Sequence, residues 1–341
     1  MTIQATRNES ANDEQAWLGR PRSLSIGARL HGHVGHVWPR RRGRKHRHVD
    51  AARAAGINLL DTGDFYGMGH NELLIGRALR SQDSDQVLIS VKFGALRGPD
   101  SAWLGYDARP AAVKTWCAYS LNRLGTDHID IYRPARLDPN VPIEETVGAI
   151  AELIEAGYVR YIGLSEVGAE TIRRAASVHP ICDLQIEYSL ISRGIEDTIL
   201  PTCRELGIGI TAYGVLSRGL ISGHWSPERS LENRDFRNRA PRFQGENLAQ
   251  NLALVDQLRA IAETKGVSVA QIAIAWVRSR GDDILPLIGA RRRDRLEEAL
   301  GALEVELSAS DLERIEQAVP RGAAVGDRYD SAQMGQLDSE R

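Results

Sequence analysis

Three polar side chains lie where two predicted strands end. Asp61 follows an apolar run in the stretch LLDTGDFYG, Tyr66 lies in the loop after it, and Lys92 closes the next run in LISVKFG. A phenol has a pKa of about 10 and is a poor acid near neutrality. A buried ammonium beside it stabilises the phenolate, and a carboxylate keeps that ammonium charged. Such a set could protonate a carbonyl oxygen as hydride reaches the carbon. Singly, the aspartate could cap a helix and the lysine could be solvated, but at adjacent strand ends they favour catalysis.

Alternating strand and helix patterns would position these residues. From residue 57 onward, short apolar runs typical of buried strands alternate with amphipathic stretches at helical spacing. One such stretch, residues 142–157, places its isoleucines and Val147 on one face and stops at Gly157. Continuous apolar strands between helices indicate a parallel sheet covered on both faces. The expected strands are residues 57–60, 86–91, 128–132, 159–165, 183–187, 208–213 and 284–289.

Seven βα units are visible, and a poorly readable one before residue 57 makes eight. The pattern therefore predicts an α/β fold, a (β/α)8 TIM barrel in a single domain. We expect a polar N-terminal tail at 1–20, the barrel at 21–320 and a C-terminal tail at 321–341. A doubly wound dinucleotide fold would need GxGxxG between a strand and a helix, and the near match GIGITA at 207–212 lies inside a predicted strand.

Composition limits the partners. The net charge of −2 and the isoelectric point of about 6.5 give the whole chain no attraction to nucleic acid. Three widely spaced cysteines suit a reducing compartment and favour buried thiols. The polar N-terminus lacks the apolar core of a signal peptide, and no run approaches the roughly 20 apolar residues of a membrane span. We expect a cytoplasmic protein with a small-molecule partner, no metal, and a monomeric or small homo-oligomeric state.

Several stretches resemble the aldo-keto reductase family. They run in order, at family spacing, from about residue 50 to 320: GINLLDTGDFYGMGHNELLIGRAL, VLISVKFG, YIGLSE, QIEYSL, AYGVLSRGL and LPLIGARRRDRLEEALGAL. The resemblance implies a barrel that binds NADPH or NADP+ across its C-terminal mouth, without a Rossmann domain. It also implies NADPH-dependent reduction of an aldehyde or ketone, with Asp61, Tyr66 and Lys92 in three places of the family's catalytic tetrad.

The fourth tetrad place departs from the family pattern. Where the family usually has a histidine, IYRPARLDP places Ala135, with Arg133 and Arg136 nearby. A branch of the family that includes pyridoxal-reductase-like enzymes also lacks this histidine. We therefore interpret Ala135 as a trait of a subgroup and not as proof of inactivity. Two alternatives stay open. The RPAR stretch could simply pack the barrel rim, or the chain could be a catalytically weak NADP-binding barrel that acts as a redox-sensing regulator or subunit.

The resemblance assigns the nicotinamide end of the cofactor to three strand ends. Ser165 and Gln185 match the pair that hydrogen-bonds the carboxamide, and Tyr213 matches the ring that stacks on the nicotinamide. Glu166 stands where the family usually has asparagine, so that contact is an open question.

The phosphate groups and the substrate are assigned to loops and to the last barrel helix. Gly219 and Leu220 would lie along the pyrophosphate. A helix N-terminus with arginines suits the adenosine 2′-phosphate and favours NADPH over NADH, the alternative being a solvated run of charge. Trp103 and Tyr106, in a loop at 94–110, would form apolar walls for the substrate beside Ala135 and Arg136. The residues assigned around the last helix are Gly289, Ala290, Arg291, Arg295 and Glu298.

Residues 28–48 fit no element of a barrel. The stretch RLHGHVGHVWPRRRGRKHRH holds five of the nine histidines and has no apolar stripe. With synonymous codons displaced by one nucleotide, residues 28–48 can read LGCMGMSGMYGPADEAESIAT, which resembles the family's first strand, turn and helix start. We interpret the segment as a compensated frameshift, in the gene or in its sequencing. A histidine metal site and a nucleic-acid-binding arm are the alternatives.

Overall fold

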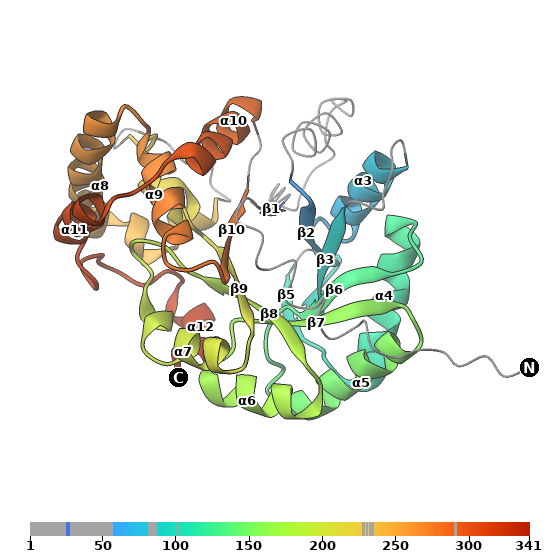
Figure 1. The fold of residues 1–341 in the computed structure, drawn as a ribbon. Coiled ribbons are helices and arrows are strands. Elements are labelled where there is room, and N and C mark those ends of the chain that lie inside the picture. Colours follow the sequence, from blue (N-terminus) through green and yellow to red (C-terminus); the bar gives the residue numbers. More distant parts are fainter. Residues whose placement is uncertain are drawn as a thin grey trace, which may run out of the picture.

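The computed structural model describes residues 25–27, 57–80, 87–100, 102–226, 229, 231, 235–289 and 292–341. Seven parallel strands lie side by side in the order β2, β3, β6, β7, β8, β9, β10 (Figure 1). They contain all seven predicted strands, with ends shifted by a few residues. Their bounds are Leu59–Gly63, Leu88–Phe93, Ile129–Pro134, Val159–Ser165, Ile181–Glu187, Gly209–Tyr213 and Ile284–Ile288. The chain is thus α/β, with a parallel sheet that curls as a half-barrel.

A short strand, β1 (Ser25–Gly27), lies between the two edges of this sheet. It pairs in parallel with β10 and with β2. The residues that follow it up to 56 lie outside the described chain, and with them the stretch that we interpret as frameshifted.

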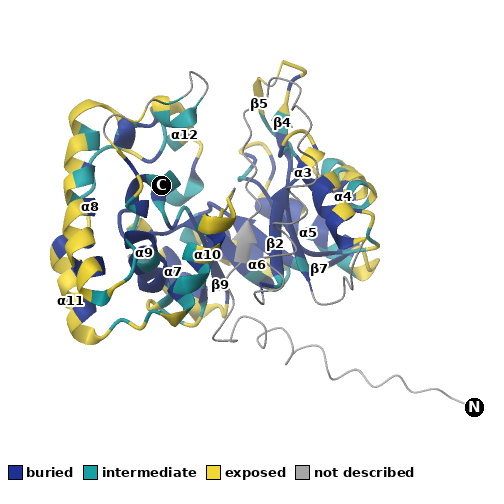
Figure 2. Cartoon of the chain, turned by 90° about the horizontal axis from the view of Figure 1, so that it is seen from above, coloured by how far each residue is buried: buried dark blue, intermediate teal, exposed yellow. Residues whose placement is uncertain are grey.

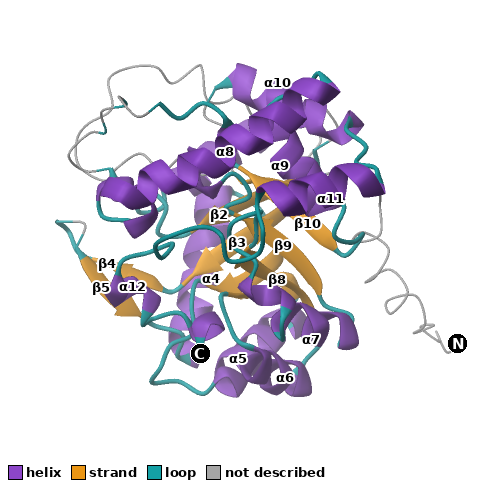
Figure 3. Cartoon of the chain, turned by 90° about the vertical axis from the view of Figure 1, so that its left-hand side faces the viewer, coloured by secondary structure: helices purple, strands orange, loops and turns teal. Residues whose placement is uncertain are grey.

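Helices cover the outer face of the sheet (Figures 1 and 3). In α5, Ile143, Val147 and Ile150 are buried against the strands, as the apolar spacing predicts. Gly157 follows the helix with φ 81°, a left-handed conformation that glycine adopts at low cost. The α-helices are α3 His70–Leu79, α4 Pro110–Leu124, α5 Ile143–Glu155, α6 Ala169–Val178, α7 Ile199–Glu205, α8 Gly245–Lys265, α9 Val269–Arg278, α10 Arg293–Gly301, α11 Ala309–Ala318 and α12 Ser331–Met334. The 3-10 helices are η2 Gly194–Glu196, η3 Ser217–Ser222, η4 Phe236–Asn238, η5 Pro241–Phe243, η6 Ala302–Glu304 and η7 Asp338–Glu340.

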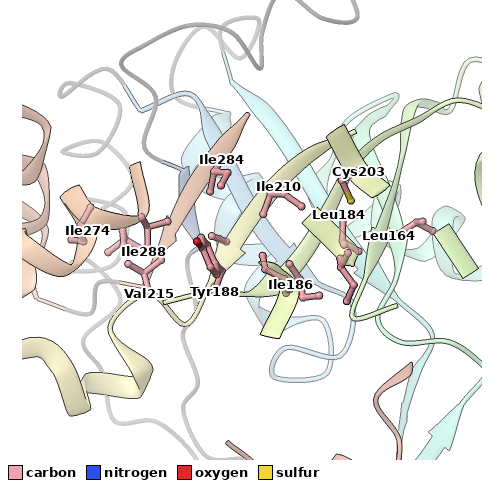
Figure 4. Close-up of a cluster of buried hydrophobic side chains, with 14 of the residues drawn as sticks. Leu164, Leu184, Ile186, Tyr188, Cys203, Ile210, Val215, Ile274, Ile284 and Ile288 are labelled. Atoms are coloured by element: carbon pink, nitrogen blue, oxygen red, sulfur yellow. The ribbon is translucent and has the colours of Figure 1, made fainter. Parts of the chain in front are cut away.

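The apolar core lies between the sheet and its helices. Figure 4 shows Leu184 of β8 and Ile210 of β9 beside Cys203 of α7, and Ile288 of β10 beside Ile274 of α9. All five are at most 4% exposed. Figure 2 shows the same separation, with buried strands inside and many exposed residues along α8. Burial raises the pKa of Cys203 to about 12, so this thiol is held neutral and unreactive. The described residues include no helix long and apolar enough to cross a bilayer.

Two peripheral segments are more ordered than the sequence predicts. The expected loop at 94–110 contains an antiparallel hairpin, β4 (Ala95–Arg97) with β5 (Trp103–Tyr106). Residues 321–341, expected as a tail, contain α12 and η7, and α12 lies beside this hairpin in Figure 3. The Tyr106 hydroxyl donates to Gln336 at 3.4 Å. Residues 321–341 therefore lie against the β4–β5 hairpin and do not extend away as a tail.

Candidate active site

A buried ion pair joins β2 and β3. Lys92 Nζ lies 2.5 Å from Asp61 Oδ2, and both residues are at most 3% exposed. Gln185 and Ser90 donate to Asp61 Oδ1 at 2.8 and 3.0 Å. Burial alone would raise the pKa of Asp61, but the charges of Lys92 and Arg133 outweigh it and hold that pKa below its usual range. The site therefore holds a carboxylate and an ammonium in contact.

The loop after β2 brings Tyr66 to this pair. The Tyr66 amide donates to the Gly63 carbonyl at 2.9 Å, closing a tight turn at the strand end. Gly67, Met68 and Gly69 then adopt positive φ, which turns the chain into α3. Tyr66 is 4% exposed, and Lys92 Nζ lies 5.1 Å from the centre of its ring. The three residues expected at adjacent strand ends are thus brought together.

A second buried pair lies in the sheet interior and was not predicted. Arg133 of β6 donates to Asp183 of β8 at 2.9 Å and to Ser90 at 3.0 Å, and it is fully buried. Thr211 also donates to Asp183, at 2.6 Å. The available signal was a charged residue of each sign on two of the predicted strands, Arg133 at the end of β6 and Asp183 in β8. Arg133 is engaged here, so it is not the group that stands at the missing histidine.

Ala135 and Arg136 follow β6 at the mouth. Ala135 is 3% exposed, and its amide donates to the Phe93 carbonyl at 2.8 Å. Arg136 Nη1 donates to the Ala135 carbonyl at 2.7 Å and contacts Ser165 Oγ at 3.4 Å. The Arg136 guanidinium therefore lies between the Ala135 carbonyl and Ser165, one of the two residues assigned to the carboxamide.

The three nicotinamide positions lie at successive strand ends. Ser165, Gln185 and Tyr213 belong to β7, β8 and β9 and are at most 2% exposed. Gln185 bonds to Asp61, which connects this row to the Lys92–Asp61 pair. The Tyr213 hydroxyl lies 3.0 Å from that of Tyr329, in the C-terminal segment.

The loop assigned to the pyrophosphate is η3, after β9. Ser217, Arg218 and Gly219 have φ of 43°, 57° and 96°, so three successive residues are left-handed. Ser217 Oγ is buried without a hydrogen-bond partner, whereas Leu220 is fully buried among apolar side chains. The amides of Ser217 and Gly219 already donate to the carbonyls of Gly214 and Leu216, so the group here that fits an anionic oxygen is the unsatisfied Ser217 hydroxyl.

Part of the site assigned to the adenosine lies outside the described residues. This holds for Ala290 and Arg291, whereas Gly289 is described and exposed. Arg295 of α10 donates to Glu298 at 2.9 Å, and both contact His224. A basic and acidic cluster thus lies on the first turns of this helix.

The residues assigned to the substrate include Trp103 and Tyr106 of the β4–β5 hairpin. Trp103 is 39% exposed, and its ring meets Tyr106 edge-on with centres 5.0 Å apart. The Arg97 guanidinium stacks over Trp103 at 4.6 Å. Part of the aromatic surface is therefore covered by the hairpin's own arginine.

Sequence reasoning missed one residue at the mouth, Arg328. It donates to Glu166 Oε1 at 2.9 Å and to Oε2 at 2.5 Å, and to Tyr213 Oη at 3.3 Å. Nothing in the polar C-terminal stretch indicated this contact. In the described part of the chain, no three His, Cys, Asp or Glu side chains are grouped as a metal would need.

Comparison with known proteins shows the family of this chain. The sequence model of the Aldo/keto reductase family matches residues 27–320. The chain is 44% identical over 283 residues to the probable aldo-keto reductase 1 of Glycine max, covering 82% of this chain and 81% of that protein. The chain belongs to the aldo/keto reductase family, so the oxidoreductase class and the NADP(H) cofactor expected from its motifs are those of its own family.

Solved structures show the same fold. A glycerol dehydrogenase from Gluconobacter oxydans superposes with a TM-score of 0.79 at 28% identity, covering 85% of this chain and 89% of that one. An aldo/keto reductase from Klebsiella pneumoniae, solved with NADP and acetate, gives a TM-score of 0.67 at 24% identity, with 90% and 94% covered.

Proposed function

We propose that the chain reduces an aldehyde or ketone to an alcohol with NADPH, and that Tyr66 is the proton donor. The observation that carries this proposal is the place of the Lys92 ammonium. It lies 2.5 Å from the Asp61 carboxylate and 5.1 Å from the centre of the Tyr66 ring, inside a buried site.

Each residue of this set has a distinct task. NADPH, when bound, supplies the hydride. Tyr66 Oη gives its proton to the carbonyl oxygen, and the Lys92 ammonium stabilises the phenolate that remains. Asp61 keeps that ammonium charged and fixes its direction. Burial excludes water, which strengthens these electrostatic contacts.

The cofactor assignment extends over the mouth. Ser165 and Gln185 would bind the carboxamide, and Tyr213 would stack on the nicotinamide. The left-handed loop around Gly219, with the unsatisfied Ser217 hydroxyl, supports a pyrophosphate there. Gly289, Ala290, Arg291, Arg295 and Glu298 would hold the adenosine end of the cofactor, with the two arginines binding its 2′-phosphate. The Klebsiella pneumoniae relative was solved with NADP, which supports the same choice.

The proposal also covers architecture and partners. The two pairings of β1 support closure of the half-barrel into an eight-stranded (β/α)8 barrel, as one domain over residues 21–320. The partner is a small carbonyl compound and not nucleic acid. We expect the chain in the cytoplasm, as a monomer or a small homo-oligomer.

One observation favours a second candidate function. Ala135 offers no side-chain hydrogen bond where the family usually has histidine. A catalytically weak NADP-binding barrel, acting as a redox-sensing regulator or subunit, would tolerate this alanine.

NADPH consumption distinguishes the two functions. The purified chain is mixed with NADPH and a panel of aldehydes and ketones, pyridoxal included, and cofactor binding is followed separately by fluorescence. Turnover of at least one carbonyl, at a rate that saturates, supports the reductase. Tight NADPH binding with no turnover across the panel supports the regulator.

A further inference from the structure

The Glu166 carboxylate is the centre of a buried polar cluster at the end of β7. It has no solvent exposure, and its backbone has a φ of 54°, which is costly for a residue with a side chain. Besides the two Arg328 bonds, it accepts from the Glu187 amide at 2.9 Å and from Ser339 Oγ at 2.8 Å. Burial acts to raise the pKa of Glu166, but the charge and hydrogen bonds of Arg328 outweigh it and hold it well below its usual range. Glu166 is thus fully engaged by protein groups.

Arg328 connects this carboxylate to the last residues of the chain. It is 6% exposed, and it donates to Glu340 Oε1 through Nε at 3.0 Å and through Nη2 at 2.7 Å. A planar guanidinium can hold two carboxylates at once in this way, whereas an ammonium cannot match the paired geometry. Glu166 therefore holds residues 326–341, here called the C-terminal segment, through Arg328 and through its direct bond from Ser339.

The same segment touches the ring assigned to the nicotinamide. Arg328 Nη1 and Tyr329 Oη reach Tyr213 Oη at 3.3 and 3.0 Å. Arg218 of η3 lies over the Tyr329 ring at 4.5 Å and pairs with Glu187 at 3.1 Å. Two consecutive residues thus contact the ends of β8 and β9 and the loop assigned to the pyrophosphate.

Apolar packing secures this segment only in part. Leu337 is 3% exposed, but a cavity of about 480 Å³ remains between the segment and the loop after β8. Glu187, Arg242 and Arg328 are among the residues that line it. A segment with open space beneath it depends more on its polar contacts for its position.

We propose that Glu166 and Arg328 form a positioning pair that holds the C-terminal segment against Tyr213 and so fixes the ring on which the nicotinamide stacks. The inference rests on the proposed function, because it needs NADPH at this mouth. It gives a task to the glutamate that stands where the family usually has asparagine: Glu166 acts through Arg328 and Tyr213, without touching the cofactor.

The test measures NADPH affinity and the protection of the segment separately. The variants are Glu166→Gln, Arg328→Met, the double variant and Arg328→Lys. The matched control is Arg193→Met, which breaks another largely buried arginine pair, 3.0 Å from Glu196. Fluorescence gives the dissociation constant for NADPH, and hydrogen exchange without cofactor reports on residues 326–341.

We expect either single variant to weaken NADPH about tenfold and to speed exchange in the segment. The double variant should lose about as much as either single one, because both remove one shared contact. Arg328→Lys should recover part of the affinity, since it keeps the charge but not the paired geometry. Arg193→Met should lower the melting temperature and leave NADPH affinity within about twofold.

Two outcomes would overturn the pairing. One is unchanged or tighter NADPH binding in a variant whose segment exchanges faster, because the segment would then not position the ring. The other is unchanged exchange and affinity in Glu166→Gln, a variant of nearly the same shape that keeps the fold. A wild-type chain that binds no NADPH would refute the proposed function instead, while exchange would still report whether Glu166 holds the segment.

Discussion

Two buried ion pairs of the same length serve this site differently. Lys92 lies 2.5 Å from Asp61, and Arg328 lies 2.5 Å from Glu166. In both, burial opposes the charged carboxylate and the neighbouring cation outweighs it, which lowers the pKa of the acid. The pairs differ in what lies next to the cation: the phenol that we propose as the proton donor, or the ring that we propose is held in place.

The type of cation in each pair, an ammonium or a guanidinium, fits the group that lies beside it. The compact ammonium of Lys92 faces the Tyr66 ring and can respond to the charge that develops on its oxygen. The Arg328 guanidinium donates to two carboxylates and to the hydroxyls of Tyr213 and Ser339, so it fixes geometry. Similar buried pairs can therefore serve chemistry or positioning, and the neighbouring group decides which.

Removing the first cation should have the largest effect. Lys92→Met should lower turnover about 1,000-fold, because assisted proton transfer contributes 10²–10⁴-fold. NADPH affinity should stay within a few-fold, since Lys92 bonds to Asp61 and not to the residues assigned to the cofactor. The control is Lys114→Met, which removes an exposed pair with Glu152. Near-normal turnover of Lys92→Met in steady-state assays would contradict its role.

Neutralising the first carboxylate should cost less activity but more stability. Asp61→Asn should lower turnover about 100-fold, since the ammonium remains but loses its fixed direction. It also leaves a buried cation without its counter-charge, which destabilises by about 3–5 kcal/mol. Denaturant unfolding and turnover measured on the same preparation check both parts. A variant as stable as wild type would show that Asp61 does not hold this charge.

Asp64 extends the comparison to a buried carboxylate that forms no ion pair in the described chain. Burial and the nearby Glu72 raise the pKa of Asp64 to about 7. Because the folded chain holds this proton more tightly, the contribution of Asp64 to stability is most favourable at about pH 4 and below and falls as the pH rises toward 7. Asp64→Asn should remove that fall, a gain of a few kcal/mol at pH 8, at about 1.4 kcal/mol per pKa unit. Thermal melts from pH 5 to pH 8 check it, and parallel curves for both proteins would contradict it.

The smallest effect is expected far from both pairs. Arg295 is half-exposed on α10 and already bonds Glu298. Arg295→Ala should weaken NADPH about fivefold and leave NADH unchanged, because only NADPH carries the 2′-phosphate. Paired titrations with the two cofactors measure this. Equal losses for both would assign Arg295 another task.

The two pairs also show how far the sequence could predict the site. Asp61, Tyr66 and Lys92 follow from where strands end, since parallel strands bring those ends to one mouth. All seven readable strands were found for the same reason: buried parallel strands are continuous apolar runs. The sites assigned to Ala290 and Arg291, and the frameshift interpretation of residues 28–48, stay predictions outside the described chain.

The rest depended on contacts that no local pattern carries. Glu166 and Arg328 are 162 positions apart, against 31 for Asp61 and Lys92, and the C-terminal segment has no apolar spacing. Asp183 and Arg133 pair inside the sheet, and the only sign of this pair in the sequence was the presence of charged residues on predicted strands. The β4–β5 hairpin was expected as a loop because it is short and half exposed. Long-range polar pairing of this kind is set by tertiary packing, not by local sequence.

The most direct test of the central claim is the Tyr66→Phe variant, measured for NADPH binding and for single-turnover reduction of a carbonyl that the wild type accepts. The account predicts that NADPH affinity stays within a few-fold and that the reduction step slows at least about 100-fold, because the phenol gives the proton and does not hold the cofactor. A variant that reduces the carbonyl at a near-normal rate would contradict it.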